Sequence, residues 1–117
     1  MEELKNDKIT VIISAHGAEL QSIKSAEGRE YLWQGDEKYW PRRSPLLFPI
    51  VCGLWNGQYR VDGKTYELPR HGFARDMDFD VIEKTESSVT YELTSNEETM
   101  KVYPYEFGLN VSYFLND

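Results

Sequence analysis

The dipeptide Asp62-Gly63, with a strand-like arm on each side, is the feature that most restricts how this chain can fold. Asp-Gly tolerates the positive φ angles that both central positions of a type I′ turn require, and such a turn connects antiparallel strands. The arms contain β-branched and aromatic residues, which are typical of strands. The sequence therefore predicts a β-hairpin over residues 58–68.

The rest of the chain carries further strand signals and one short helical signal. Residues 107–115 alternate strictly between apolar and more polar or small side chains, which predicts a long half-buried strand. The other predicted strands are 8–14, 18–24, the short 31–33, and a second hairpin of 78–84 and 88–94. Residues 97–101 predict one helical turn, and 34–43 an ordered loop. The predicted fold class is all-β and antiparallel.

The most apolar run of the chain, Pro45 to Val51, does not fit an ordinary central strand. Pro45 and Pro49 have no N–H group, so two hydrogen bonds of a β-ladder would be missing. We therefore expect this run to form buried irregular structure or an edge.

The predicted last strand has no returning arm in these 117 residues, because only Asn116-Asp117 follows it. A long apolar strand with an unpaired edge promotes association, and proteins usually protect such edges. We expect the natural protein to continue, or another chain to supply the partner strand. The sequence shows no repeats and no linker that would divide it into domains.

Composition narrows the class of protein further. With 40% apolar residues the chain can bury a core, and its net charge of −7 argues against nucleic acid or an anionic membrane as the main partner. The single cysteine, Cys52, cannot form an internal disulfide, and we find no signal peptide and no apolar stretch of about 20 residues. These features predict a cytoplasmic protein.

The loop between the two hairpins, residues 68–76, is the best candidate for a binding site. It combines an imidazole, a flexible glycine, an aromatic ring and two cations, and rigid strands commonly position such loops for binding. A sugar needs planar donors and acceptors for its hydroxyls and an aromatic face for its C–H surface. His71, Arg75 and Phe73 offer these groups. The competing interpretation is structural: His71 caps a turn and Arg75 pairs with Asp76 or Asp78.

Other residues with chemical potential have structural interpretations that we favour. Trp33, Trp40 and Trp55 could stack on a sugar ring, but large aromatic residues more often lie in a core or at its rim. Arg42-Arg43 could hold a phosphate, but surface pairing is the simpler reading in so acidic a chain. We expect His16 to be structural, and Cys52 to be a buried, inert thiol.

No cofactor or metal is expected. One cysteine and two histidines provide no zinc or iron ligand spacing, and Gly-rich phosphate loops are missing from the sequence.

Several segments, taken together, resemble the aldose 1-epimerase (galactose mutarotase-like) family, in its LacX-like branch. The order and spacing agree along nearly the whole chain. The segments that carry the resemblance are Gly17 to Leu20, Tyr31 to Trp33, Ser44 to Val51, Asn56 to Tyr66, His71 to Asp76 and Tyr103 to Phe107.

The resemblance implies a large antiparallel β-sandwich that binds a sugar in a cleft, of which residues 1–117 form the N-terminal part. It implies interconversion of the α and β anomers of an aldose, with a catalytic histidine and glutamate that lie beyond residue 117. The implied sugar-binding residue within the chain is His71, with Arg75 as a weaker companion. A non-catalytic carbohydrate-binding or regulatory protein on the same scaffold is the alternative.

The chain departs from the family pattern after Val51. Relatives commonly continue with Gly-Arg, whereas this chain has Cys52-Gly53, so a cation near the substrate is missing. Arg43 or Arg75 is expected to replace it. If both reach the cleft, a sugar phosphate becomes a candidate substrate.

Overall fold

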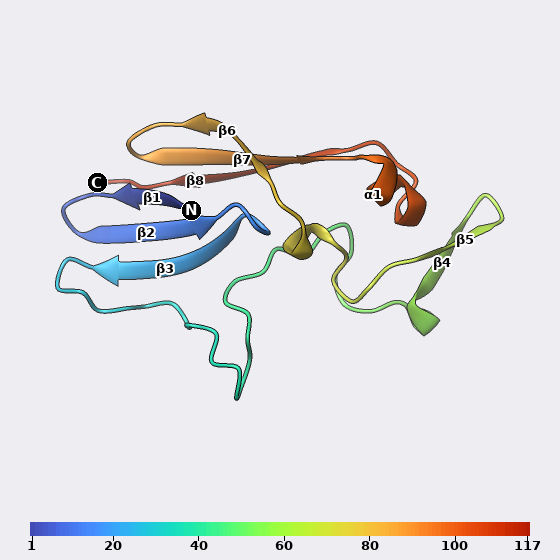
Figure 1. Cartoon of the computed structure of the whole chain (residues 1–117), viewed down its shortest axis with the longest axis horizontal. Coiled ribbons are helices and arrows are strands. Elements are labelled where there is room, and N and C mark those ends of the chain that lie inside the picture. The colour runs from blue at the N-terminus through green and yellow to red at the C-terminus, as the bar shows by residue number, and fades with distance from the viewer.

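The structure, a computed structural model, describes residues 1–117 and consists of three antiparallel sheets with one short helix (Figure 1). The first sheet contains β1 (Glu2–Lys5), β2 (Ile9–Ser14) and β3 (Glu19–Ser25). The second contains β4 (Gln58–Val61) and β5 (Lys64–Glu67), and the third contains β6 (Asp80–Lys84), β7 (Ser88–Thr94) and β8 (Gly108–Phe114). The helix α1 spans Glu97–Val102, and 3-10 turns span Trp55–Gly57 and Ala74–Asp76. The antiparallel all-β prediction is confirmed.

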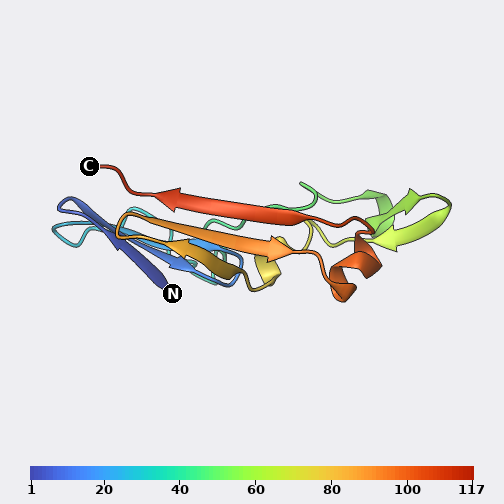
Figure 2. The same cartoon turned by 90° about the horizontal axis from the view of Figure 1, so that it is seen from above.

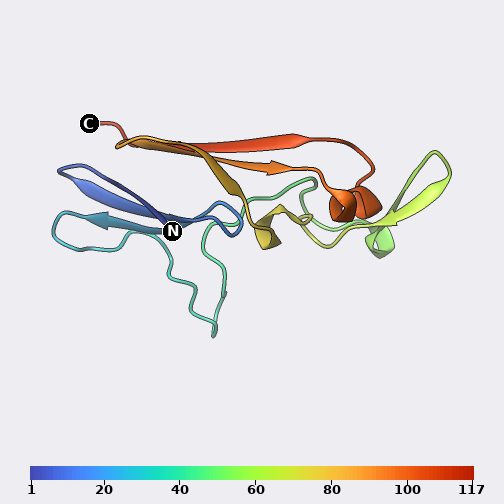
Figure 3. The same ribbon diagram turned by 45° about the horizontal axis from the view of Figure 1, so that its top comes forward.

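The hydrophobic core joins the first sheet to the third. Leu4 and Ile13 of the first sheet are buried together with Val89 and Tyr91 of β7. The Tyr91 hydroxyl also donates to the Ile13 carbonyl oxygen at 3.4 Å. Figure 3 shows the two sheets lying next to each other with their strands along the long axis of the molecule. Apolar burial between these sheets is thus the main force that holds them in place.

The predicted hairpin at Asp62-Gly63 is confirmed. Asp62 has a φ of 48° and Gly63 a φ of 77°, as a type I′ turn requires. The Tyr59 and Tyr66 rings face each other across the strands at 5.6 Å, and the Tyr59 hydroxyl donates to the Val102 carbonyl oxygen at 2.5 Å. The hairpin therefore rests on α1, at the end of the molecule far from both termini (Figure 1).

The predicted helical turn is present as α1, and its start is fixed by a capping box. The Asn96 side chain accepts from the Thr99 N–H, while the Thr99 hydroxyl accepts from the Asn96 N–H, both at 2.9 Å. These bonds satisfy two main-chain donors that a helix start leaves free.

β8 has the half-buried alternation that the sequence predicts. Leu109, Val111 and Tyr113 are partly buried and their neighbours are exposed. The strand pairs with β7 along its full length and with nothing on its other side, and Figure 2 shows β8 lying along β7. The Tyr113 hydroxyl donates to the Ala18 carbonyl oxygen at 2.6 Å and so ties β8 to the first sheet.

One prediction about the middle of the chain is wrong, and another holds only in part. Residues 31–33 do not form a strand, because the Glu30 carboxylate takes the N–H groups of Ile23 and Leu32, at 2.8 and 3.2 Å. The run from Pro45 to Val51 is irregular, as predicted, but it is only partly buried: Leu46 and Phe48 pack against the core, whereas Val51 is 65% exposed. The expected burial needed a covering layer, and no element of this chain covers Val51.

The molecule is thin in one direction, with extents of 56, 35 and 18 Å. None of its helices has both the length and the apolar character that crossing a bilayer would demand.

Candidate functional site

The candidate site is built on a tight turn from Pro69 to Gly72. The Gly72 N–H donates to the Pro69 carbonyl oxygen at 2.9 Å, which closes the turn. His71 takes the third position with a φ of 66°, and Gly72 follows with a φ of 74°. A positive φ at the third position, with Arg70 at the second position not in that region, is typical of a type II turn.

The preceding irregular segment, residues 48–52, holds this turn from the other side. The Phe48 carbonyl oxygen accepts from the Phe73 N–H at 2.9 Å and from the Ala74 N–H at 3.2 Å. A Cβ atom at Gly72 would overlap that same oxygen, so only glycine fits here. The irregular path of the apolar run is thus what brings its main chain against the histidine turn.

At its far end the same segment contacts the histidine itself. The Cys52 N–H donates to the His71 Nδ1 atom at 2.8 Å, and the His71 N–H donates to the Cys52 carbonyl oxygen at 3.0 Å. Desolvation and the positive charges of Arg70 and Arg75 lower the pKa of the His71 imidazole below its ordinary value. The imidazole is therefore neutral at pH 7.

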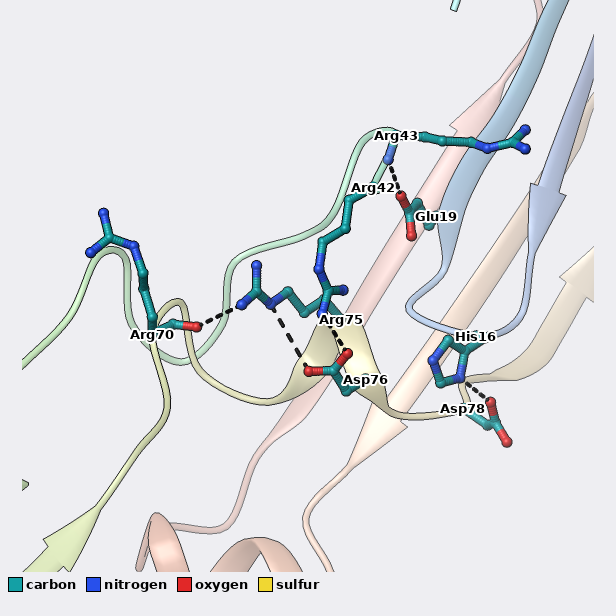
Figure 4. A network of polar contacts seen from close by, with 8 residues as sticks. All are labelled: His16, Glu19, Arg42, Arg43, Arg70, Arg75, Asp76 and Asp78. Carbon is teal, nitrogen blue, oxygen red and sulfur yellow. Dashed lines mark hydrogen bonds and ion pairs between the residues drawn. The ribbon is translucent and has the colours of Figure 1, made fainter. Parts of the chain in front are cut away.

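Three arginines surround this turn. Arg75 donates to the Arg70 carbonyl oxygen at 3.0 Å, and its Nε atom lies 4.0 Å from an Asp76 oxygen (Figure 4). Arg42 pairs with Asp76 at 2.9 Å. The structure therefore contains the Arg75–Asp76 pair that the structural interpretation foresaw. The Arg75 side chain is only 17% exposed, whereas that of Asp76 is 53% exposed, so the pair lies where the fold meets solvent.

Arg70 lies beside Gly53, the position where the family resemblance led us to expect an arginine. The Arg70 Nη1 atom is 3.8 Å from the place that a Cβ atom of residue 53 would occupy. Arg70 is exposed and makes no ion pair within the chain. The Arg70 guanidinium thus lies near Gly53, although Arg70 belongs to the histidine turn and not to the segment that contains Gly53. Arg70 was not among the predicted site residues, although its place directly before His71 was a usable signal.

Arg43 lies apart from the other arginines. Its guanidinium donates to the Gln21 carbonyl oxygen at 2.5 Å and to the Gln34 side chain at 3.1 Å. Its main-chain N–H donates to the buried Glu19 carboxylate at 3.0 Å. Figure 4 shows its guanidinium pointing away from Arg70 and Arg75. The guanidinium groups of Arg43 and Arg75 therefore do not converge in this structure.

Phe73 belongs to an aromatic cluster next to the turn. Its ring centroid lies 6.2 Å from that of Phe48, 6.4 Å from that of Tyr103 and 5.9 Å from that of Phe107. The ring is partly buried and packs against the hydrophobic core. Within this chain Phe73 therefore anchors the turn.

The tryptophans and Cys52 lie on the surface. Trp33, Trp40 and Trp55 are 43%, 47% and 88% exposed, and the Trp33 indole N–H donates to the Trp40 carbonyl oxygen at 2.8 Å. His16 is exposed and pairs with Asp78 at 2.8 Å, in line with a structural role.

Cys52 is a free, exposed cysteine, so the prediction of a buried thiol is wrong. Its φ of 69° turns the chain out of the apolar run at that residue.

None of the four surface hollows of this chain is lined by His71 or Arg75. A hollow of about 290 Å³ includes Arg43 together with Glu30 and Gln34. The chain by itself therefore does not enclose a cleft at His71.

The fold defines the class of protein. The structure superposes with a TM-score of 0.96 on a galactose mutarotase related enzyme from Lactobacillus acidophilus, at 49% identity, covering 98% of this chain and 39% of that one. A galactose mutarotase-like protein from Lactobacillus casei gives a TM-score of 0.95 at 45% identity, covering 100% and 40% of the two chains. The chain thus has part of a galactose mutarotase-like fold.

The sequence assigns the family. The model of the aldose 1-epimerase family matches residues 2–117, and the chain belongs to that family. Protein LacX of Lactococcus lactis is 42% identical over 119 residues, covering 97% of this chain and 40% of that protein. A protein of Escherichia coli K12 named "Putative glucose-6-phosphate 1-epimerase" is 31% identical over 120 residues, covering 90% and 40%. The chain therefore spans about 40% of the length of these curated relatives.

Proposed function

We propose that the full-length protein is an aldose 1-epimerase-like isomerase that interconverts the α and β anomers of an aldose. The observation that carries the proposal is the family match over residues 2–117, together with a neutral, partly exposed histidine on the turn that the family resemblance marks as sugar-binding. In this proposal residues 1–117 are the N-terminal part of one β-sandwich domain. Polypeptide outside them completes the cleft and pairs with the free edge of β8, or another chain does so.

Ring opening requires two proton transfers. One group protonates the ring oxygen while another removes the proton from the anomeric hydroxyl, and each such group contributes on the order of 10²–10⁴ in rate. Within these residues the proposal assigns only binding: His71 donates to a sugar oxygen, Phe73 supports its turn, and Arg75 stabilises the adjacent main chain. The acid and the base lie in the remainder of the protein.

Polarimetry tests the proposal directly. We expect the full-length protein to accelerate the change in optical rotation of freshly dissolved α-D-galactose or α-D-glucose in proportion to protein concentration. The 117-residue chain is expected to cause no acceleration, because it lacks the acid and the base. Acceleration by the purified 117-residue chain would contradict this assignment. Sugar binding by the full-length protein without acceleration would favour the non-catalytic binding alternative.

A sugar phosphate is a second candidate substrate, and a specific observation favours it. Arg70 directly precedes His71, is exposed and has no ion-pair partner, in a chain of net charge −7. Guanidinium groups bind phosphate well because their planar donors match its oxygens. The Escherichia coli relative named for glucose 6-phosphate agrees with this candidate.

Replacement of Arg70 distinguishes the two substrates. If the substrate carries a phosphate, Arg70→Gln is expected to weaken binding of glucose 6-phosphate by about fivefold, or ~1 kcal/mol, as for an exposed ion pair. Binding of glucose should not change. Lys64→Gln, which removes an exposed cation from the β5 hairpin, is the matched control. Isothermal titration at low and high salt measures the affinities for glucose 6-phosphate and for glucose. If Arg70→Gln weakens both affinities equally, a phosphate site at Arg70 is excluded.

A further inference from the structure

The two hydrogen bonds between Cys52 and His71 form a closed clip around the imidazole. In one bond the Cys52 N–H donates to Nδ1, and in the other the His71 N–H donates to the Cys52 carbonyl oxygen, at 2.8 and 3.0 Å. Both residues have positive φ angles, 69° and 66°, which side chains other than glycine adopt only when the surroundings hold them there. The surrounding structure thus holds the main chain at both Cys52 and His71 in the conformation that these two hydrogen bonds require.

The chemistry of the clip allows only one form of the neutral imidazole. A main-chain N–H is always a donor, so the nitrogen that faces it must present a lone pair. Nδ1 is therefore unprotonated, and the ring hydrogen of the neutral form must be on Nε2. His71 has no other hydrogen bond through its side chain within the chain, so the Nε2–H group remains available.

We propose that the Cys52 main chain is a positioning group that fixes His71 as the Nε2–H tautomer, so that the histidine presents one donor to an acceptor oxygen of the bound sugar. The part concerning the sugar rests on the proposed function, whereas the tautomer does not. Fixed in this way, His71 does not accept a proton from the anomeric hydroxyl through Nδ1. Its role is to orient the sugar.

The charges around the clip act in the same direction. Protonation would place a hydrogen on Nδ1, opposite the Cys52 N–H, and two donors would then face each other. The ionisable groups that act on the ring are Arg70 and Arg75 on its own segment, and the Cys52 thiol on the opposite segment is exposed. Desolvation and the two arginines lower the pKa of His71 and so keep the clip closed at neutral pH.

Two-bond ¹H–¹⁵N correlation spectra of the full-length protein, labelled at histidine, test the tautomer. At pH 7 we expect the His71 signals to show a protonated Nε2 and an unprotonated Nδ1, with or without sugar. The His71→Asn variant identifies those signals by their loss, and His16 gives the internal comparison. An Nδ1–H tautomer, or an average of both tautomers, would overturn the proposal.

Variants separate the main chain of Cys52 from its thiol. Cys52→Ala keeps the N–H group and is expected to leave the tautomer unchanged. His71→Asn places an amide oxygen near the former Nδ1 position, and asparagine tolerates a positive φ, so the Cys52 amide should stay protected from hydrogen exchange. His71→Ala should lose that protection. A changed tautomer in Cys52→Ala, or equal exchange in the Asn and Ala variants, would refute the clip.

Sugar titration separates this inference from the proposed function. Because His71→Asn keeps the clip and loses the distal donor, we expect its affinity for D-galactose or D-glucose to fall at least tenfold. His71→Gln, whose amide N–H₂ reaches toward the Nε2 position, should recover part of the loss. An Nε2–H tautomer with sugar affinity unaffected by His71→Asn would refute the sugar-binding role and leave the tautomer assignment standing.

Discussion

Replacement of Gly72 by alanine is expected to destabilise the protein strongly and to displace the histidine turn. Gly72 has a φ of 74°, and an added Cβ atom would overlap the carbonyl oxygen of Phe48. That oxygen accepts two main-chain hydrogen bonds and cannot move without breaking them. The left-handed conformation costs an alanine about 1–2 kcal/mol and overpacking about 1–3 kcal/mol, so we expect a loss of roughly 2–5 kcal/mol.

Gly63→Ala provides the matched control for this prediction. Gly63 also has a positive φ, 77°, but nothing lies within 4 Å of the added Cβ atom. Only the conformational cost of about 1 kcal/mol is then expected. Urea unfolding of both variants measures the difference in free energy of unfolding. Equal decreases in the free energy of unfolding would show that the Phe48 carbonyl can move aside, and that residues 48–52 do not hold the histidine turn in place.

The parts of the fold that the sequence predicted well depend on local patterns. The Asp62-Gly63 turn, the 88–94 strand and the alternation along β8 each follow from neighbouring residues alone. In such segments turn chemistry and the two-residue period already fix which side chains face the core. The structure adds the pairing partners but does not change these elements.

The predictions that proved wrong concern segments whose structure depends on residues distant in the sequence, or on side chains that take the place of main-chain hydrogen-bond partners. Residues 31–33 look like a strand, but the Glu30 carboxylate takes N–H groups that a ladder would otherwise use. Cys52 follows an apolar run, but it is exposed and held by a residue 19 positions later. Neither contact has a signature in the local sequence.

The candidate site shows the same division. The composition of residues 68–76 predicted a loop between the two hairpins, and the structure has that loop with His71, Phe73 and Arg75 on it. The sequence did not reveal that Arg70 stands beside Gly53, nor that the Cys52 main chain holds the imidazole. Both facts arise where two irregular segments cross, and no periodicity describes such crossings.

The stability of the core is expected to fall steeply in alkaline solution because of Tyr91. Its side chain is fully buried, and desolvation, with the negative charge of Glu2, raises the pKa of Tyr91 to about 12. An unfolded tyrosine has its ordinary pKa near 10, so between pH 10 and 12 the folded state binds more protons than the unfolded state. The free energy of unfolding therefore decreases as the pH rises through this window, by roughly 2–3 kcal/mol in total.

The Tyr91→Phe variant isolates this contribution because it keeps the ring and cannot ionise. At pH 7 it should lose less than about 1 kcal/mol, since the only hydrogen bond removed, to Ile13, is long at 3.4 Å. Between pH 10 and 12 its curve should fall less than that of the wild type by roughly 2 kcal/mol. Tyr39→Phe, at a ring that is 70% exposed, controls for the loss of one phenol. Parallel curves for the wild type and Tyr91→Phe would mean that the hydroxyl reaches solvent before unfolding, and that the two sheets separate locally at Ile13.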